Sequence, residues 1–318
     1  MKEADTAVSF DSEPPSAFAG GCVTIGNFDG VHLGHRELLR NLRQMSDGLG
    51  THAVAVTFWP HPAQVLAGRP PASLLPLNDR VRMLLSQGAD AVWVCPFDLA
   101  LAGLEAAEFL DRVLVSKLSV RGVVVGPDFR FGAGRTGSGQ LLERFACEQG
   151  IRLSVVPPCT VDGIRVSSSE IRSAVAKGLV DEAGRFLGRF YRVKGRVVHG
   201  AHLGTGLGYP TANIEPSREV VLPGNGVYVV RMRLGDAPAL TVPLEGVASV
   251  GTRPTIDDGP VRIEVHLFDF EREVYGESAT VEFLHRLRGE TRFESVQQLI
   301  EQIRQDVQDA RAFFALKG

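Results

Sequence analysis

Two histidines, His32 and His35, lie three residues apart in the stretch GNFDGVHLGH, where an apolar run ends and a helical pattern begins. Gly26, Gly30 and Gly34 allow the backbone to approach a ligand closely, and the first turn of the following helix offers unpaired N–H groups and a positive dipole end. The two imidazoles can add further hydrogen-bond donors at the same place. The stretch therefore predicts a phosphate-binding site at the end of a strand.

The histidine pair also has simpler interpretations. A histidine near a helix start is commonly a cap or a packed surface group. The H-x-x-H pattern also offers two nitrogen ligands to zinc, but no nearby cluster of Cys and His completes a tetrahedral site, so distant residues would have to do so. We therefore favour phosphate over zinc.

A second group of polar residues lies in VSSSEIR, where Ser167, Ser168 and Ser169 precede Arg172 at a predicted helix start. The hydroxyls can form an ordinary N-cap, a capping box or a solvated turn. They can equally form an anion cradle with the backbone N–H groups and the arginine fork. Two such cradles in one domain would suit a triphosphate held at both ends.

Short β-branched runs alternate with helical patterns over residues 21–178. The runs CVTIG, HAVAVTF, DAVWVCPF, RGVVVG and IRLSVVPP are too apolar for half-exposed strands and are typical of a parallel sheet covered on both faces. Between them, Ala107, Leu110, Leu114 and Leu118 fall on one predicted helical stripe. The pattern predicts an α/β, Rossmann-like, doubly wound parallel sheet, whose ligands bind at the carboxyl ends of the strands.

A different pattern begins near residue 191. The runs RVKGRVV, GVYVVRMRL, TVPLEGVASVG, RIEVHLFDF and ATVEFLHRL alternate apolar and polar residues between turns, which predicts a small antiparallel β-barrel. A final long helix starts with a capping-box pair, Ser295 and Gln298, and we expect it to pack on the barrel. Its predicted apolar stripe consists of Val296, Leu299, Ile300, Ile303, Val307 and Ala310. We expect a mobile tail over 1–20 and domains over 21–186 and 187–318.

The barrel sequence contains a second glycine-rich loop, HLGTGLGYPTANI. Its backbone can cradle phosphates while a hydroxyl and an amide reach a hydrated Mg²⁺ ion, although such a turn can also be purely structural. The residues concerned are Gly204, Gly206, Gly208, Pro210, Thr211 and Asn213. On the polar side of RIEVHLFDF, Glu264 lies between Arg262 and His266, where it is either part of a surface ion-pair ladder or a catalytic carboxylate.

The composition limits the partners of the protein. The 318 residues carry a net charge of −3, which provides no basic field for nucleic acid, and four scattered cysteines indicate reduced thiols. No basic, apolar leader opens the chain, and no apolar run reaches the roughly 20 residues of a membrane helix. We expect a cytoplasmic protein without a membrane partner.

One motif points to a different function, because GAGRTG over residues 132–137 matches the dinucleotide pattern G-x-G-x-x-G. That fingerprint must follow its strand directly and needs an acidic residue about 20 positions later at the end of the next strand. Here PDFRF intervenes and IRLSVVPP ends without an acidic residue. We therefore expect a flexible loop here and reject a dehydrogenase.

The sequence resembles a known family at several of these motifs. GNFDGVHLGH, VVVGPDFRFG and VSSSEIR resemble nucleotidyltransferases, and the whole arrangement is similar to the prokaryotic bifunctional riboflavin kinase/FAD synthetases. In the second half, LGYPTANI, NGVY, GVASVGTRPTI and EVHLFDF look like the riboflavin kinase module. The resemblance covers nearly the whole chain.

The resemblance implies two ATP-dependent reactions: phosphorylation of riboflavin to FMN, and adenylylation of FMN to FAD with release of pyrophosphate. It implies that Glu264 is the base for the flavin hydroxyl, with Thr211 and Asn213 placing Mg²⁺ and ATP. The ATP phosphates of the adenylyltransferase would be held by Gly26, Asn27, His32, His35, Ser167, Ser168 and Arg172. Asp128, Phe129 and Arg130 would lie near the flavin or its phosphate, although Phe129 can equally belong to the core.

The sequence departs from the family pattern at three positions. Thr205 and Ser249 stand where the family usually has arginine and asparagine, and Ser169 replaces a usual threonine. Loss of the arginine removes a cation from the kinase loop. Two alternatives follow: an FMN adenylyltransferase whose barrel binds flavin without phosphorylating it, and a non-catalytic, flavin-responsive binding protein. In each case flavins and ATP are the expected partners, and the chain is expected to be a monomer or a weak homo-oligomer.

Overall fold

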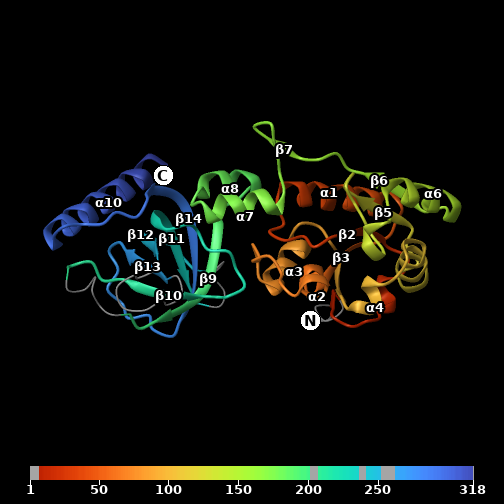
Figure 1. Ribbon diagram of the computed structural model, residues 1–318, viewed down its shortest axis with the longest axis horizontal. Coiled ribbons are helices and arrows are strands. Elements are labelled where there is room, and N and C mark those ends of the chain that lie inside the picture. The colour runs from red at the N-terminus through yellow and green to blue at the C-terminus, as the bar shows by residue number, and fades with distance from the viewer. Residues whose placement is uncertain (1–6, 201–206, 236–240, 252–261, 318) are drawn as a thin grey trace. The chain divides into compact units, whose positions relative to one another are not determined.

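The computed structural model describes residues 7–200, 207–235, 241–251 and 262–317. The chain divides into two compact units, Met1–Ser167 and Ser168–Gly318. Figure 1 labels their helices and strands.

The first unit is built on a six-stranded parallel sheet with the order β1-β4-β3-β2-β5-β6. Its strands are β1 (Val8–Ser9), β2 (Cys22–Ile25), β3 (Ala53–Trp59), β4 (Ala91–Pro96), β5 (Gly122–Val125) and β6 (Arg152–Val155). The chain builds outward from β2 to β3 and β4 on one side and then to β5 and β6 on the other. The predicted doubly wound sheet is confirmed, and its topological switch point lies beside β2, where ligands bind in such folds.

Helices cover both faces of this sheet because both alternating sets of residues in the central strands are largely apolar. One set of strand residues packs on α1 (Leu33–Gly48) and α3 (Leu77–Ser86); the set is Cys22, Ala53, Ala55, Val92, Val94 and Val124. The other set packs on α5 (Ala106–Phe109), η2 (Leu110–Lys117) and α6 (Gly139–Gln149); it includes Val23, Ile25, Val54, Val56, Trp93 and Val123. The core is therefore two apolar layers that enclose the sheet.

The prediction that Ala107 belongs to the buried helical stripe was wrong. Leu110, Leu114 and Leu118 are fully buried, but Ala107 is exposed and Ala106 takes its place in the core. A step of four residues back from Leu110 comes closer to a whole number of helical turns than a step of three. Ala106 therefore continues the buried face.

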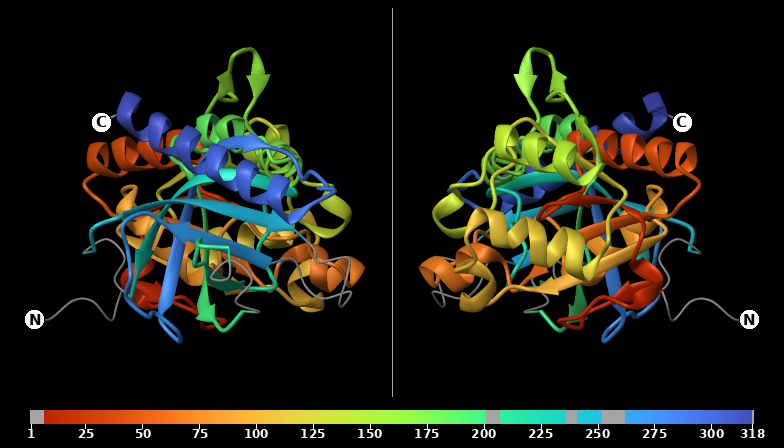
Figure 2. Two further views of the ribbon diagram at one scale, coloured as in Figure 1. Left: turned by 90° about the vertical axis from the view of Figure 1, so that its left-hand side faces the viewer. Right: turned by 90° about the vertical axis from the view of Figure 1, so that its right-hand side faces the viewer.

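Residues that we expected in a mobile tail contribute to the first unit. Val8 and Ser9 pair with Val92 and Trp93 of β4, and Phe18, in the short turn η1 (Ser16–Phe18), is only 2% exposed. The remaining elements are α2 (Pro62–Ala67), α4 (Leu99–Ala102), η3 (Ala133–Arg135) and the hairpin of β7 (Thr160–Val161) and β8 (Ile164–Arg165). The hairpin projects away from the sheet (Figures 1 and 2).

The second unit contains a closed antiparallel barrel with the strand order β10-β13-β12-β11-β14-β9. The strands are β9 (Tyr191–Val198), β10 (Ala212–Pro216), β11 (Gly226–Leu234), β12 (Leu244–Gly251), β13 (Arg262–Leu267) and β14 (Ser278–Arg288). The five predicted strands are present. β10 was not predicted, because its residues follow the glycine-rich loop without a long apolar alternation.

In the described part of the second unit, the helices are α7 (Ser168–Ala176), α8 (Val180–Leu187) and α10 (Val296–Lys317). α10 lies along the outside of the barrel, where Ala310 and Phe314 pack against Val227 and Leu284 (Figures 1 and 2). Ser295 caps it by accepting the Gln298 N–H at 3.2 Å. Val296, expected in the apolar stripe, is 56% exposed, because packing on the barrel begins only further along the helix.

The helix α7 is anchored to the barrel unit. The Gly224 N–H donates to the Val175 carbonyl at 3.0 Å, and Arg286 of β14 donates to the Lys177 carbonyl at 3.3 Å. The compact units therefore separate between Ser167 and Ser168. The domain division at 186/187 stays a prediction. None of the helices in the described ranges is long and apolar enough to cross a membrane.

Candidate active sites

The turn between β2 and α1 is tightly folded. Phe28, Gly30 and Val31 all have positive φ angles, of 48°, 82° and 39°. The buried Asp29 carboxylate accepts the Leu74 N–H at 2.8 Å and the Leu75 N–H at 3.4 Å. Such a conformation is costly for Phe and Val, and it persists only where surrounding contacts determine it. The turn is therefore a pre-formed structure at the switch point of the sheet.

The two histidines meet at the start of α1. His32, 6% exposed, is the N-cap residue, and its Nδ1 accepts the His35 N–H at 3.3 Å. The two rings stack with their centroids 3.6 Å apart and an interplanar angle of 16°, and Phe28 packs edge-on against His35. The cap and the predicted donor pair thus involve the same residues.

Asn27 contacts a histidine that the sequence motifs did not single out. Its side-chain Nδ2 lies 3.2 Å from Nε2 of His61, whose Nδ1 caps α2 by accepting the Ala63 N–H at 3.1 Å. His61 follows the end of β3, the strand beside β2, so both loops leave the same edge of the sheet. In the sequence TFWPHP, His61 closely follows the end of a predicted strand, and this position could have identified it as a candidate site residue.

Zinc has no cluster of ligands in the described ranges. No group of three or more His, Cys, Asp or Glu residues there is arranged to hold a metal ion.

The predicted flavin residues follow β5. Asp128 is exposed and forms an ion pair with Arg165 of β8. Phe129 is half-buried and stacks on Phe131 with 5.4 Å between centroids, so part of it belongs to the core. Arg130 is exposed and donates to the Phe129 carbonyl at 3.1 Å.

The GAGRTG segment after these residues is a packed turn. Phe131 and Gly137 form a β-bridge, and a Cβ on Gly137 would lie 2.5 Å from the Phe131 ring. The expectation of a flexible loop is not what the structure shows. Residues 126–131 separate the segment from the end of β5, which agrees with the reason for rejecting the dinucleotide motif.

The VSSSEIR residues lie around the start of α7. Ser168 is its first residue, and the Ser169 hydroxyl accepts a hydrogen bond from Arg172 Nη2 at 3.3 Å. Ser168 and Arg172 belong to the second unit, and His32 and His35 to the first. A common phosphate cradle of the two groups stays a prediction.

Glu264 lies in the centre of a polar row across three barrel strands. In the register of the sheet it is opposite Asn213 of β10 on one side and Ser249 of β12 on the other. Its neighbours Ile263 and Val265 are fully buried, which confirms the predicted alternation of β13. Glu264 itself is half-buried. The row places a carboxylate between an amide and a hydroxyl.

Asn213 has an unusual environment for an amide. It is 5% exposed, and its Oδ1 is buried without a hydrogen-bond partner in the part of the chain that the structure describes. The backbone of Gly200 packs so closely that a Cβ there would lie 2.1 Å from Asn213 Nδ2. A buried carbonyl oxygen that lacks a protein partner suits a cation or a ligand donor.

The predicted phosphate loop of the barrel is described only in part. Gly204 and Gly206 lie outside the described residues, as does Thr205. Gly208 has a φ of 84°, which glycine adopts without strain. The Pro210 carbonyl lies 2.9 Å from Nδ1 of His266, two residues beyond Glu264 on β13.

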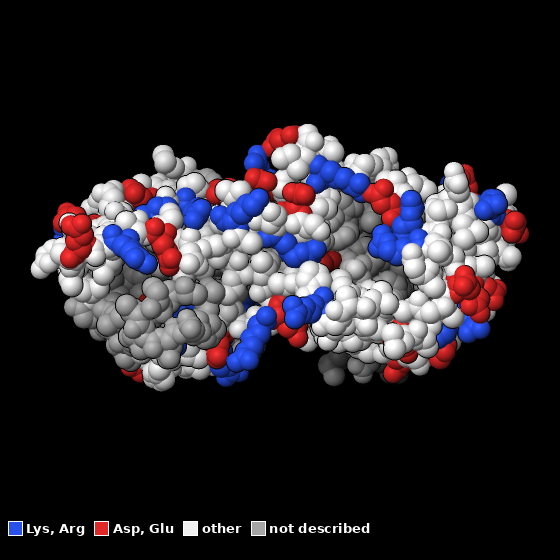
Figure 3. All heavy atoms as spheres, in the orientation of Figure 1, with Lys and Arg blue, Asp and Glu red and all other residues white. Residues whose placement is uncertain are grey.

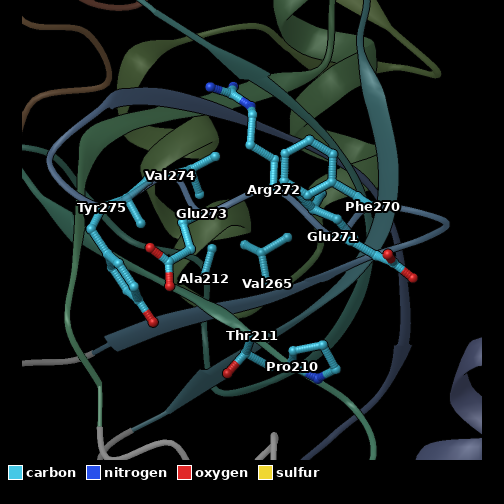
Figure 4. A pocket seen from close by; sticks show the side chains of 12 residues that line it. Pro210, Thr211, Ala212, Val265, Phe270, Glu271, Arg272, Glu273, Val274 and Tyr275 are labelled. Atoms are coloured by element: carbon cyan, nitrogen blue, oxygen red, sulfur yellow. The ribbon is translucent and has the colours of Figure 1, made fainter.

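Pro210 and Thr211 border a small cavity of about 160 Å³ at one end of the barrel. Figure 4 shows the cavity between these residues, Val265 and the segment 270–275, with the Arg272 guanidinium directed away from Thr211. On the face shown in Figure 3, acidic and basic side chains are interspersed.

Comparison with known proteins decides the family. A FAD synthetase family model matches residues 15–170, and a riboflavin kinase family model matches residues 187–314. The bifunctional riboflavin kinase/FMN adenylyltransferase of Haemophilus influenzae is 40% identical over 296 residues, which cover 92% of this chain and 94% of the relative. The chain belongs to the bifunctional riboflavin kinase/FMN adenylyltransferase family.

Other relatives agree. The bifunctional riboflavin kinase/FMN adenylyltransferase of Pseudomonas fluorescens is 41% identical over 93% of this chain and 94% of its own length. A Streptococcus pneumoniae crystal structure titled a macrolide-efflux protein has a TM-score of 0.84 at 30% identity, covering 94% of this chain and 97% of that one.

The chain carries both domains of this family of enzymes, so the predicted fold class and the predicted bifunctional activity are confirmed. The riboflavin kinase model extends over the whole barrel, and the curated relatives are bifunctional enzymes, so family membership supports the two activities over a barrel that only binds flavin. The same relatives are named as enzymes, which supports catalysis over a non-catalytic binding protein. Riboflavin, FMN, FAD and ATP are the compounds of these two activities.

Proposed function

We propose that the turn after β2 binds ATP for transfer of its adenylyl group to FMN, and we propose the residues at the start of α7 separately as a phosphate-binding group. Gly26 and the first turn of α1 offer backbone N–H groups, and the Asn27 amide and the two imidazoles add donors. The residues concerned are Gly26, Asn27, His32 and His35 in the first group, and Ser167, Ser168 and Arg172 in the second. The observation that carries the proposal is the stacked pair His32 and His35 at the helix start, because it concentrates donors where a helix attracts anions.

The chemistry of this site requires no protein nucleophile. An FMN phosphate oxygen attacks the α-phosphorus of ATP, and the bond to the pyrophosphate oxygen breaks. Negative charge accumulates on phosphate oxygens, so the protein contributes by placing the reactants and by directing donors at that charge. The pre-formed turn suits this role, since its donors need no rearrangement.

Asp128, Phe129 and Arg130 are proposed to lie beside the flavin of FMN. Arg130 is exposed and can meet a phosphate, while the exposed face of Phe129 can meet an aromatic ring. The ion pair between Asp128 and Arg165 makes an orienting role for Asp128 more suitable than direct binding.

In the barrel we propose Glu264 as the base that accepts the proton of the riboflavin 5′-hydroxyl during phosphoryl transfer from ATP. Its position between Asn213 and Ser249 restricts where the carboxylate can point. Gly204, Gly206, Gly208 and Pro210 would form the loop around the ATP phosphates. Phosphoryl transfer depends mainly on positioning, with a base of this kind contributing a further factor.

Mg²⁺ is proposed to bind at Thr211 and Asn213. The buried Oδ1 of Asn213, which has no hydrogen-bond partner among the described residues, is an oxygen of the kind that Mg²⁺ accepts, and Thr211 offers a hydroxyl two residues away. When bound there, the ion would neutralise charge on the ATP phosphates. Thr211 and Asn213 would orient it beside Glu264.

Two substitutions separate the proposed sites. Glu264→Gln keeps the shape of the side chain and should lower FMN formation by about 100-fold or more, with FMN adenylylation unchanged. Arg172→Met should slow adenylylation and leave FMN formation unchanged, with Arg185→Met on α8 as the matched control. Flavins are separated by chromatography after incubation with ATP and Mg²⁺. An unaltered rate in either variant would refute the role given to that residue.

The finer expectations about partners and location belong to the same proposal. We propose a cytoplasmic enzyme that is a monomer or a weak homo-oligomer and binds neither nucleic acid nor membrane. Light scattering over a concentration series tests the oligomeric state.

A further inference from the structure

Arg80 is a buried cation in the first unit that the proposed chemistry does not use. It lies on α3 and is 2% exposed, and burial lowers the pKa of its guanidinium. A buried charge is tolerated only where hydrogen bonds and an opposite charge compensate it. The contacts of Arg80 therefore indicate why the protein retains it.

These contacts converge on one carbonyl group. Arg80 Nη1 donates to the Asn27 carbonyl at 2.9 Å and lies 3.4 Å from the hydroxyl of Thr57, which donates to the same carbonyl at 3.2 Å. Asp29, 5% exposed in the same turn, supplies the opposing charge that raises the pKa of Arg80 against the effect of burial. Two side chains from two different elements, β3 and α3, thus hold a single backbone position.

The carbonyl that they hold belongs to Asn27, which is proposed above to bind ATP. The side chain of Asn27 lies 3.2 Å from His61, and Asn27 immediately follows Gly26 at the switch point. With its carbonyl held by two donors, the peptide after Asn27 is restrained, which places the backbone from which the Asn27 side chain extends; the contact with His61 then orients the side chain itself.

We infer that Arg80 and Thr57 are positioning residues of the adenylyltransferase site, which hold the Asn27 carbonyl and thereby aim the Asn27 amide at the ATP phosphates. The inference rests on the proposed role of Asn27 in ATP binding. Neither Arg80 nor Thr57 touches the substrate; both act through Asn27.

A double-mutant cycle distinguishes this role from simple packing. Arg80→Met keeps the apolar stem and removes the guanidinium donor, and it should lower kcat for FMN adenylylation by about 100-fold, as displacements near 1 Å can. Thr57→Val should lower it by about tenfold, and Arg80→Lys should recover part of the Arg80→Met loss because a donor returns. In an Asn27→Ala background the same Arg80→Met change should cost less than about threefold, since coupled residues are not additive.

The full-length enzyme supplies the controls. FMN formation from riboflavin is measured on each variant as a reference for the barrel, and tryptophan fluorescence verifies folding of the first unit. Arg82→Met, on the exposed side of the same helix, should leave both rates unchanged.

Three outcomes overturn the inference. It fails if Arg80→Met folds and adenylylates FMN at the normal rate, or if its effect is fully additive with that of Asn27→Ala. If Arg80→Met does not fold, the cycle with Thr57→Val decides, and additivity there overturns the inference too. An Asn27→Ala variant with a normal rate would instead refute the proposed role of Asn27 on which the inference rests.

Discussion

His32 caps helix α1 with the same imidazole that stacks on His35: its Nδ1 accepts the His35 N–H at 3.3 Å, and the two ring centroids are 3.6 Å apart. Since Nδ1 accepts, the neutral His32 ring carries its proton on Nε2, the nitrogen that can donate to a phosphate oxygen. One side chain therefore serves both the fold and the proposed chemistry, and substitutions can separate the two.

The first prediction concerns this double role. Asparagine is a good N-cap, so His32→Asn should preserve the start of α1, whereas His32→Ala should cost about 1 kcal/mol of stability. Both variants should lose FMN adenylylation by a similar factor of about 100 or more, because both lack the imidazole donor. Unfolding in urea and single-turnover FAD formation give the two readouts. Full activity in His32→Asn would mean that His32 is only a cap.

A second prediction concerns Gly200 in the barrel. An alanine there would place its Cβ 2.1 Å from Asn213 Nδ2, and Asn213 is too buried to move aside freely. Gly200→Ala should displace Asn213 and raise the Mg²⁺ concentration required for FMN formation by about tenfold. Adenylylation should not change. Gly184→Ala, whose Cβ would make only an ordinary 3.6 Å contact, is the matched control. An unchanged Mg²⁺ dependence would contradict the role of Asn213.

A third prediction concerns the attachment of α10. Asp306, 4% exposed, accepts hydrogen bonds from Nε and Nη2 of Arg288 on β14, with separations from 2.8 to 3.2 Å. Asp306→Ala leaves the half-buried guanidinium without its carboxylate and should cost about 3 kcal/mol. Asp309→Ala on the exposed side of α10 should change stability by less than about 0.5 kcal/mol.

In the full-length protein, unfolding of the barrel can be followed separately from unfolding of the first unit. Both tryptophans of the chain, Trp59 and Trp93, lie in the first unit, so their fluorescence does not follow unfolding of the barrel. Loss of FMN formation in urea reports on the barrel, and the fluorescence transition is the internal reference. Equal midpoints for the Asp306 and Asp309 variants would show that the ion pair does not secure α10.

A fourth prediction concerns alkaline pH. Burial in β4 raises the pKa of the Cys95 thiol to about 12. Between the ordinary thiol pKa near 8.5 and about 12, the unfolded chain releases this proton and the folded chain keeps it, so the free energy of unfolding should fall as pH rises. Below that window this contribution should be constant.

Tryptophan fluorescence in urea at a series of pH values measures this slope, because Trp93 is on the same strand. Cys95→Ala should show a shallower fall above pH 9. The same slope in both proteins would exclude Cys95 as its source. In the native enzyme, Cys95 should also resist alkylation, whereas the exposed Cys147 should react readily.

The sequence predicted those features that depend on residues close together in the chain. The apolar runs that became β2 to β6 and the alternation around Glu264 are set by side-chain type and spacing, so both sheets could be predicted. The motif residues His32, His35 and Glu264 were identified in the same way or through the family resemblance. The site roles themselves stay predictions.

The errors have physical causes. Ala107 was misplaced because two adjacent alanines lie near the edge of the predicted apolar stripe, and the sequence does not show which of them is buried. In the structure, Ala106 packs against the sheet and Ala107 is exposed. β1 and β10 were missed because two and five residues carry little periodicity, and only pairing with β4, or with β13 and β9, makes them strands.

By itself, then, the sequence determined the two fold classes and the family, and it supplied the candidate residues for the chemistry, since these follow from local pattern and motif. Only the tertiary structure decided that Arg80 and Thr57 meet at the Asn27 carbonyl, that His61 lies beside Asn27, and that Asn213 lies opposite Glu264. Those neighbours are far apart in the chain. Strand order and register bring these residues together, and long-range packing in the two cores determines the strand order and the register.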